Sequence, residues 1–150
     1  MNNDKMIIGR LETMSLPEFQ IDNLNVRVDT GAQTSSLHVD NLKQILIDGK
    51  PGVSFDIHPD THDVNCLVHC EALINDIRKV KSSNGVSEQR FVIKTQAILG
   101  DLSWPIKITL TDRSDMTYLM LLGREALADK FYIDPAKVFL ASSLKNKGIK

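Results

Sequence analysis

The alternation of apolar and polar residues along much of the chain predicts short β-strands. Residues 24–28 read Leu-Asn-Val-Arg-Val and residues 106–110 read Ile-Lys-Ile-Thr-Leu, the pattern of a strand with one buried face. Residues 55–57 show a shorter version of this pattern, and an extended run covers residues 86–99. Residues 118–122 are apolar throughout, as expected for a strand that is buried on both faces.

Turn residues separate these runs and leave little room for helix. The pair Asn84-Gly85 between two extended segments is a strong hairpin signal, because both residues tolerate positive φ. Only residues 123–130 read as a helix, and a last short strand is predicted at residues 138–140. Because we find neither an internal repeat nor a low-complexity linker, we expect one mainly β domain over residues 1–150.

Composition narrows the classes of partner. The chain has 150 residues, of which 42% are hydrophobic, and a formal net charge of -1. This balance argues against nucleic acid or an anionic membrane as the main partner, since both require a basic surface. No apolar stretch resembles a secretory signal or a membrane span, and two cysteines are too few for a disulfide framework. The expected location is therefore the cytoplasm.

One short motif carries candidate chemistry. In Val28–Ala32 an apolar strand leads into Asp29, then a hydroxyl residue, Thr30, and then Gly31. The strand fixes the carboxylate, the glycine allows a sharp turn beside it, and the Thr30 hydroxyl can hydrogen-bond within that turn. Taken alone, the same three residues also fit a plain turn after a strand.

A second segment, in this order along the chain, makes the motif more specific. The apolar run at 118–122 continues into Gly123 and Arg124 and then a short helix. Together with the Asp-Thr-Gly-Ala loop at residues 29–32, this resembles the retroviral-type aspartic peptidases. In that family a glycine-tipped hairpin between the two motifs forms a flap over the substrate, and here residues 82–85 stand in that place.

The resemblance is closer to a bacterial group of retropepsin-like proteins that carries the name ATP-dependent zinc protease, and it covers about residues 8–140. It implies an all-β, closed retropepsin-like barrel with one short C-terminal helix, polar tails at both ends and no cofactor. It also implies three sets of site residues. These are a catalytic set of Asp29, Thr30 and Gly31, a substrate-binding set of Ala32, Ser83, Asn84 and Gly85, and a structural brace of Gly123 and Arg124.

The implied chemistry requires two chains. Aspartic peptidases use two carboxylates that share a proton across a bound water, because two like charges about 3 Å apart do not both ionise easily. This chain has a single Asp-Thr-Gly. The second carboxylate would therefore be Asp29 of another copy, in a homodimer with two-fold symmetry. The expected activity is endopeptidase cleavage of a peptide or protein substrate.

Two alternatives remain open. One is a retropepsin-like dimer that binds peptides without cutting them, since a fold does not guarantee a function. The other is a zinc-dependent hydrolase that uses His58, His62, Cys66 and Cys70, which are spaced four residues apart. Two observations argue against a zinc site. The segment from His58 to His62 lacks the glutamate of a metalloprotease motif. If the two cysteines lie on one strand, they would be about 13 Å apart, too far to bind one ion. No phosphate-binding loop of the P-loop type supports ATP dependence.

Overall fold

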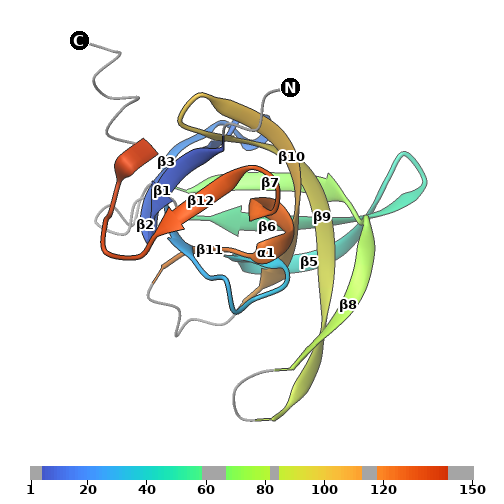
Figure 1. The fold of residues 1–150 in the computed structure, drawn as a ribbon. Coiled ribbons are helices and arrows are strands. Elements are labelled where there is room, and N and C mark those ends of the chain that lie inside the picture. Colours follow the sequence, from blue (N-terminus) through green and yellow to red (C-terminus); the bar gives the residue numbers. More distant parts are fainter. Residues whose placement is uncertain (1–4, 59–66, 82–84, 113–117, 142–150) are drawn as a thin grey trace.

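The computed structural model describes residues 5–58, 67–81, 85–112 and 118–141. These residues form strands almost throughout, with one short α-helix and one turn of 3-10 helix (Figure 1). In chain order the elements are β1 (Met6–Gly9), β2 (Leu11–Leu16), η1 (Pro17–Phe19), β3 (Ile21–Val28), β4 (Ser35–His38), β5 (Asp40–Ile47), β6 (Lys50–Ile57), β7 (Val68–Leu73), β8 (Asp76–Lys81), β9 (Ser87–Leu99), β10 (Leu102–Thr111), β11 (Met120–Leu122), α1 (Arg124–Leu127) and β12 (Phe131–Asp134).

The main sheet closes into a barrel, which confirms the predicted fold class. Its strands follow the order β10-β4-β11-β3-β2-β9-β8, and β9 also pairs with β10. The first six strands of that order therefore form a closed ring, while β8 lies outside it and, within the described residues, pairs with β9 alone. Closure leaves the ring without free edges, where a chain could otherwise add a strand.

The strand that precedes Asp29 shows the predicted alternation. In β3, Leu24 and Val26 are buried, whereas Asn25 and Arg27 are exposed. β11 inserts between β3 and β4, parallel to β3 and antiparallel to β4. β11 therefore lies inside the sheet, where it holds the end of β3 that leads into Asp29.

The predicted hairpin between the two motifs is present. β8 and β9 pair antiparallel and extend away from the barrel (Figure 1). Gly85 has a φ of 84°, a backbone conformation that favours glycine. Ser83 and Asn84, two of the predicted substrate-binding residues, lie outside the described residues. The hairpin stands where the resemblance requires a flap.

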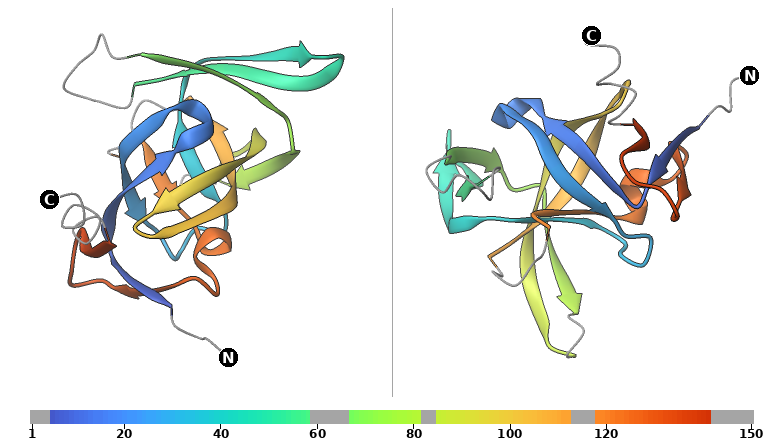
Figure 2. Two further views of the ribbon diagram at one scale, coloured as in Figure 1. Left: turned by 90° about the horizontal axis from the view of Figure 1, so that it is seen from above. Right: turned by 90° about the vertical axis from the view of Figure 1, so that its left-hand side faces the viewer.

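The segment between β4 and β8 builds a second sheet. β5, β6 and β7 form an antiparallel three-stranded sheet beside the barrel (Figure 2). Phe55 of β6 meets Phe19 edge-on, with ring centroids 5.7 Å apart, and joins the same apolar core as the barrel. Among the described residues, no helix is long and apolar enough to cross a membrane.

The C-terminal part of the chain differs from the sequence prediction. Residues 138–140 are not a strand, and the last strand is β12, which pairs parallel with β1. Phe139 has a φ of 54°, which no strand accommodates. The buried Glu12 carboxylate instead accepts hydrogen bonds from the backbone amides of Leu140 (2.8 Å) and Ala141 (3.4 Å). The helix is also shorter than the predicted 123–130.

Candidate active site

Asp29 follows β3 directly and is fixed by short-range and long-range contacts. Its backbone amide donates to the carbonyl oxygen of Leu122 at the end of β11, at 2.9 Å. Its carboxylate oxygen Oδ1 accepts a hydrogen bond from the amide of Gly31 at 3.0 Å. A Cβ added at Gly31 would lie 3.2 Å from that same oxygen, and Gly31 is not among the residues with positive φ. Glycine thus leaves room beside the carboxylate, which would have to shift by a few tenths of an ångström to accommodate a Cβ at this position.

The loop after Asp29 is clamped by the start of α1. The guanidinium of Arg124 donates from Nη1 to the carbonyl oxygen of Thr30 at 3.0 Å. The backbone amide of Arg124 donates to Ala32 (2.8 Å), and that of Glu125 donates to Gln33 (3.0 Å). The structure therefore places Arg124 where a brace of the loop is expected. Thr30 accepts this hydrogen bond through its carbonyl oxygen. None of the described residues forms a hydrogen bond with the Thr30 hydroxyl.

Gly123 allows the two chain segments to lie in contact. A Cβ at this position would lie 2.7 Å from the carbonyl carbon of Thr34 and 3.0 Å from the amide nitrogen of Ser35. The backbone amide of Gly123 donates to the Ser35 hydroxyl at 3.0 Å. Any side chain at residue 123 would push the start of α1 away from the segment that follows Asp29.

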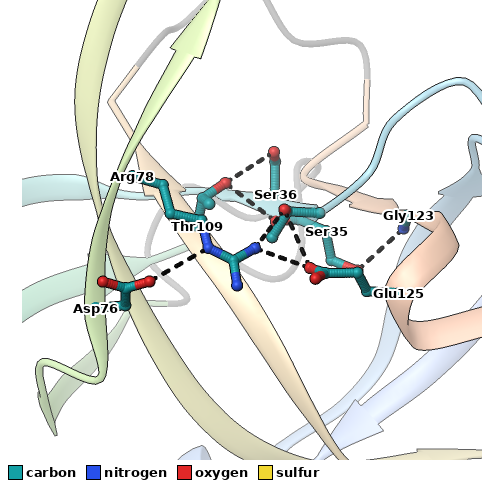
Figure 3. A network of polar contacts seen from close by, with 8 residues as sticks. Ser35, Ser36, Asp76, Arg78, Thr109, Gly123 and Glu125 are labelled. Atoms are coloured by element: carbon teal, nitrogen blue, oxygen red, sulfur yellow. Dashed lines mark hydrogen bonds and ion pairs between the residues drawn. The ribbon is translucent and has the colours of Figure 1, made fainter.

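Buried hydroxyl groups of β4 and β10 form hydrogen bonds beside this loop (Figure 3). The Thr109 hydroxyl of β10 donates to the carbonyl oxygen of Ser35 at 3.0 Å. Because its single proton is used there, the Ser36 hydroxyl must be the donor in the 3.0 Å bond between Ser36 and Thr109. All three residues are buried. These hydrogen bonds join β4 to β10 just after the loop that follows Asp29.

Arg78 connects the flap hairpin to this loop, a role that the sequence did not reveal. Its Nη1 donates to the Thr34 hydroxyl at 2.7 Å and to the Glu125 carboxylate at 2.8 Å (Figure 3). The Thr34 hydroxyl in turn donates to Glu125 at 3.2 Å. The hydrogen bond from Arg78 is the main cause that lowers the pKa of Glu125. The hydrogen bond to Glu125 likewise raises the pKa of Arg78.

A cleft of about 930 Å³ opens beside Asp29 and carries strong positive charge. Gly31 and Ala32 line it together with Asp29, whereas Gly85, Gly123 and Arg124 do not. Asp29 is the only acidic residue among the described residues that line it. The cationic residues of the lining are Arg27, Arg78, Lys79, Lys81 and Arg90.

Comparison with known proteins agrees with this geometry. A family model described as "RimB-like: Retropepsin-like aspartic endopeptidase RimB" matches residues 7–143. The chain belongs to the RimB-like family. The resemblance to retropepsin-like proteins that the two motifs indicated is therefore confirmed over nearly the whole chain.

Relatives of this family member include both longer proteins and one of similar length. A protein of Shewanella pealeana named "Probable alpha-L-glutamate ligase" is 42% identical over 93% of this chain, which spans 30% of that protein. One of the same name from Desulfotalea psychrophila is 46% identical over 88% of this chain, which spans 28% of it. A crystal structure from Legionella pneumophila, of a protein of unknown function, gives a TM-score of 0.76 at 31% identity and covers 92% of this chain and 99% of its own.

Only two of the four candidate zinc ligands, His58 and Cys70, are among the described residues. His62 and Cys66 lie outside those residues. His58 is paired through Nε2 with Asp40 at 3.2 Å, and burial raises the pKa of the Cys70 thiol to about 11. A zinc ligand needs a thiolate, so the surroundings of Cys70 oppose metal binding. Within the described ranges, no group of three or more histidine, cysteine or acidic side chains is arranged to hold a metal ion.

Proposed function

We propose that this protein is an aspartic endopeptidase that acts as a homodimer and cleaves acidic peptide segments. The observation that carries the proposal is the position of Asp29, which lies in a cleft whose other charged lining residues are all cationic. Family membership supports the peptidase chemistry, and the cleft supports the choice of substrate.

The proposed chemistry uses one Asp29 from each subunit. One carboxylate, ionised, takes a proton from a water molecule held between the two aspartates. The other, protonated, donates a hydrogen bond to the scissile carbonyl oxygen. The pair titrates as a unit, so neither aspartate has a fixed role before substrate binds. The Gly31 amide and the Arg124 clamp would hold each carboxylate in place as its charge changes.

The cationic lining favours a peptide rich in glutamate or aspartate. Arg27, Lys79 and Lys81 form no ion pair with any described residue, so their charge is available to a ligand. A cleft lined by one sign of charge attracts ligands of the opposite sign. The curated relatives bear a name that refers to attaching glutamate. A peptidase in the same family that trims glutamate-rich segments would be the chemical counterpart of such an activity.

A cleavage assay tests the proposal. Glutamate-rich and glutamine-rich peptides of equal length are incubated with the protein, and new termini are identified by mass spectrometry. We expect internal cleavage of the glutamate-rich peptide and its complete loss in Asp29→Asn. The matched control is Asp22→Asn, which changes an exposed aspartate of β3, the strand that leads into Asp29, and should leave cleavage normal. Tight binding of the peptide without cleavage by the unmodified protein would contradict the proposal and support the binding module.

A further inference from the structure

Two arginines face each other across the flap hairpin. Arg78 of β8 and Arg90 of β9 are direct cross-strand partners, and both line the cleft. Like charges placed directly opposite one another destabilise an antiparallel pair. Each arginine has carboxylate partners. Arg90 donates to Glu88 at 2.7 Å, and Arg78 donates to Glu125 at 2.8 Å and to Asp76 at 3.5 Å. The hairpin therefore holds two guanidinium groups together only with compensating negative charge.

The closest carboxylate partners of the two arginines, Glu88 and Glu125, come from different parts of the fold. Glu88 belongs to the same strand as Arg90, two residues away, and the Arg90 side chain is 10% exposed, whereas the Arg78 side chain is 23% exposed. Glu125 belongs to α1, on the far side of the catalytic loop, and its side chain is 40% exposed. The Arg78–Glu125 pair thus joins two separate elements across water-accessible space. A pair of this kind is weakly held and can exchange partners.

We infer that Arg78 is a specificity-determining residue whose partner Glu125 is exchanged for an acidic side chain of the bound peptide. This inference rests on the proposed function for the choice of an acidic ligand. In the free protein, the Glu125 carboxylate accepts the hydrogen bond from Arg78 that a ligand carboxylate would accept after the exchange (Figure 3). Thr34, which is bonded to both partners, remains as the contact between the guanidinium and the loop after Asp29.

The exchange explains how the site would distinguish glutamate from glutamine. A glutamate side chain replaces one carboxylate on Arg78 by another and keeps the guanidinium compensated beside Arg90. A glutamine side chain has the same shape but no charge, so displacing Glu125 would leave Arg78, beside Arg90, with only the longer 3.5 Å contact to Asp76. The preference for glutamate then has two sources: the attraction between its carboxylate and Arg78, and the unfavourable free energy of displacing Glu125 with an uncharged glutamine.

Binding measurements test the exchange separately from catalysis. Isothermal titration calorimetry is performed on the full chain carrying Asp29→Asn, with matched glutamate and glutamine peptides. Adding Arg78→Gln should reduce the glutamate preference about tenfold and leave the glutamine peptide unaffected. Adding Glu125→Gln should strengthen glutamate binding, because the internal competitor is removed. Lys50→Gln, an exposed cation of β6 outside the cleft lining, is the control for net charge.

The opposite signs of the two variants separate exchange from a structural ion pair. If the pair only stabilises the hairpin, both variants weaken binding of both peptides, and that result would overturn the inference. An unchanged glutamate preference in Arg78→Gln would overturn it as well. The experiment measures affinity in a chain that carries Asp29→Asn, so its result does not depend on cleavage. Failure of the unmodified protein to cleave peptides would contradict the proposed function, but it would not decide whether Arg78 exchanges its partner.

Discussion

At the scale of single residues, the site depends on backbone positions that exclude a side chain. Gly123 is the clearest case, because the atoms that a Cβ would meet belong to the backbone of Thr34 and Ser35 and cannot rotate away. The amide of the same residue donates to a buried hydroxyl. Loop and helix therefore fit together only with glycine at this position.

Gly123→Ala is expected to lower the free energy of unfolding by about 1–3 kcal/mol, the usual cost of forcing a methyl group into packed structure. Urea denaturation measures the loss, and the peptide-cleavage assay should show reduced activity because the loop carrying Asp29 moves. Gly49→Ala is the control for activity, since a Cβ there would meet nothing within 4 Å, although its φ of 79° carries a backbone cost. Full stability of Gly123→Ala would contradict the assigned close approach.

Individual residues also show which parts of the site the sequence could predict. Asp29, Gly31 and Gly123 were predictable because local motifs carry their roles. Arg78 was not, because its partner Glu125 lies 47 residues away and is brought near only by the fold. A two-residue turn at Asn84-Gly85 would place Arg78 opposite Phe91, whereas the structure pairs it with Arg90. Even a correct hairpin prediction would have missed the arginine pair.

At the scale of elements, a polar cluster joins the strands of the small sheet. Asp56 of β6 accepts hydrogen bonds from Asn41 of β5 at 2.8 Å and shares one with the Nδ1 of His69 of β7 at 2.7 Å. The bond to Asp56 raises the pKa of His69, with Glu71 contributing less. The bonds from Asn41 and then His69 lower the pKa of Asp56.

The pH dependence of this contact follows from the two directions. A raised histidine pKa contributes stability that is complete below the ordinary value of 6.5 and is lost as pH rises through the folded value. A lowered aspartate pKa contributes stability that is present above 3.8 and is lost as pH falls through the folded value. The contact between Asp56 and His69 therefore stabilises the small sheet most between those two pH values.

An NMR titration of the His69 ring protons checks the assignment. We expect the pKa of His69 to lie above 6.5 in the unmodified protein and to fall most in Asp56→Asn, because the direct hydrogen bond is lost. Glu71→Gln is the matched control, since its carboxylate lies 3.8 Å from the other ring nitrogen and should have a smaller effect. Equal shifts in the two variants would show that the hydrogen bond to Asp56 is not the main cause.

Elements differ in how far the sequence could predict them. β3 and β10 were predicted because one face of each strand is buried, which leaves an alternation of apolar and polar residues in the local sequence. The error at 138–140 has a different origin, since that segment is held by the Glu12 side chain from the other end of the chain. β12 was missed for a related reason. Its partner β1 lies at the opposite terminus, and no local pattern reports a parallel pair of that kind.

At the scale of the whole molecule, the proposed catalysis requires two chains that share one site. The chain contains one Asp-Thr-Gly, and Asp29 is the only acidic residue that the described cleft lining offers. The proposed mechanism requires a second carboxylate, and two-fold symmetry supplies it from an identical position. Neither chain would then be active alone.

Mixing unmodified and Asp29→Asn chains distinguishes a site shared by two chains from a site within one chain. Equal amounts are unfolded together and refolded, so that subunits pair at random, and cleavage is compared with unmodified protein at the same total concentration. If each site needs both aspartates, only dimers of two unmodified chains are active, and about one quarter of the activity remains. If each chain works by itself, about one half remains, and the shared site proposed here would be contradicted.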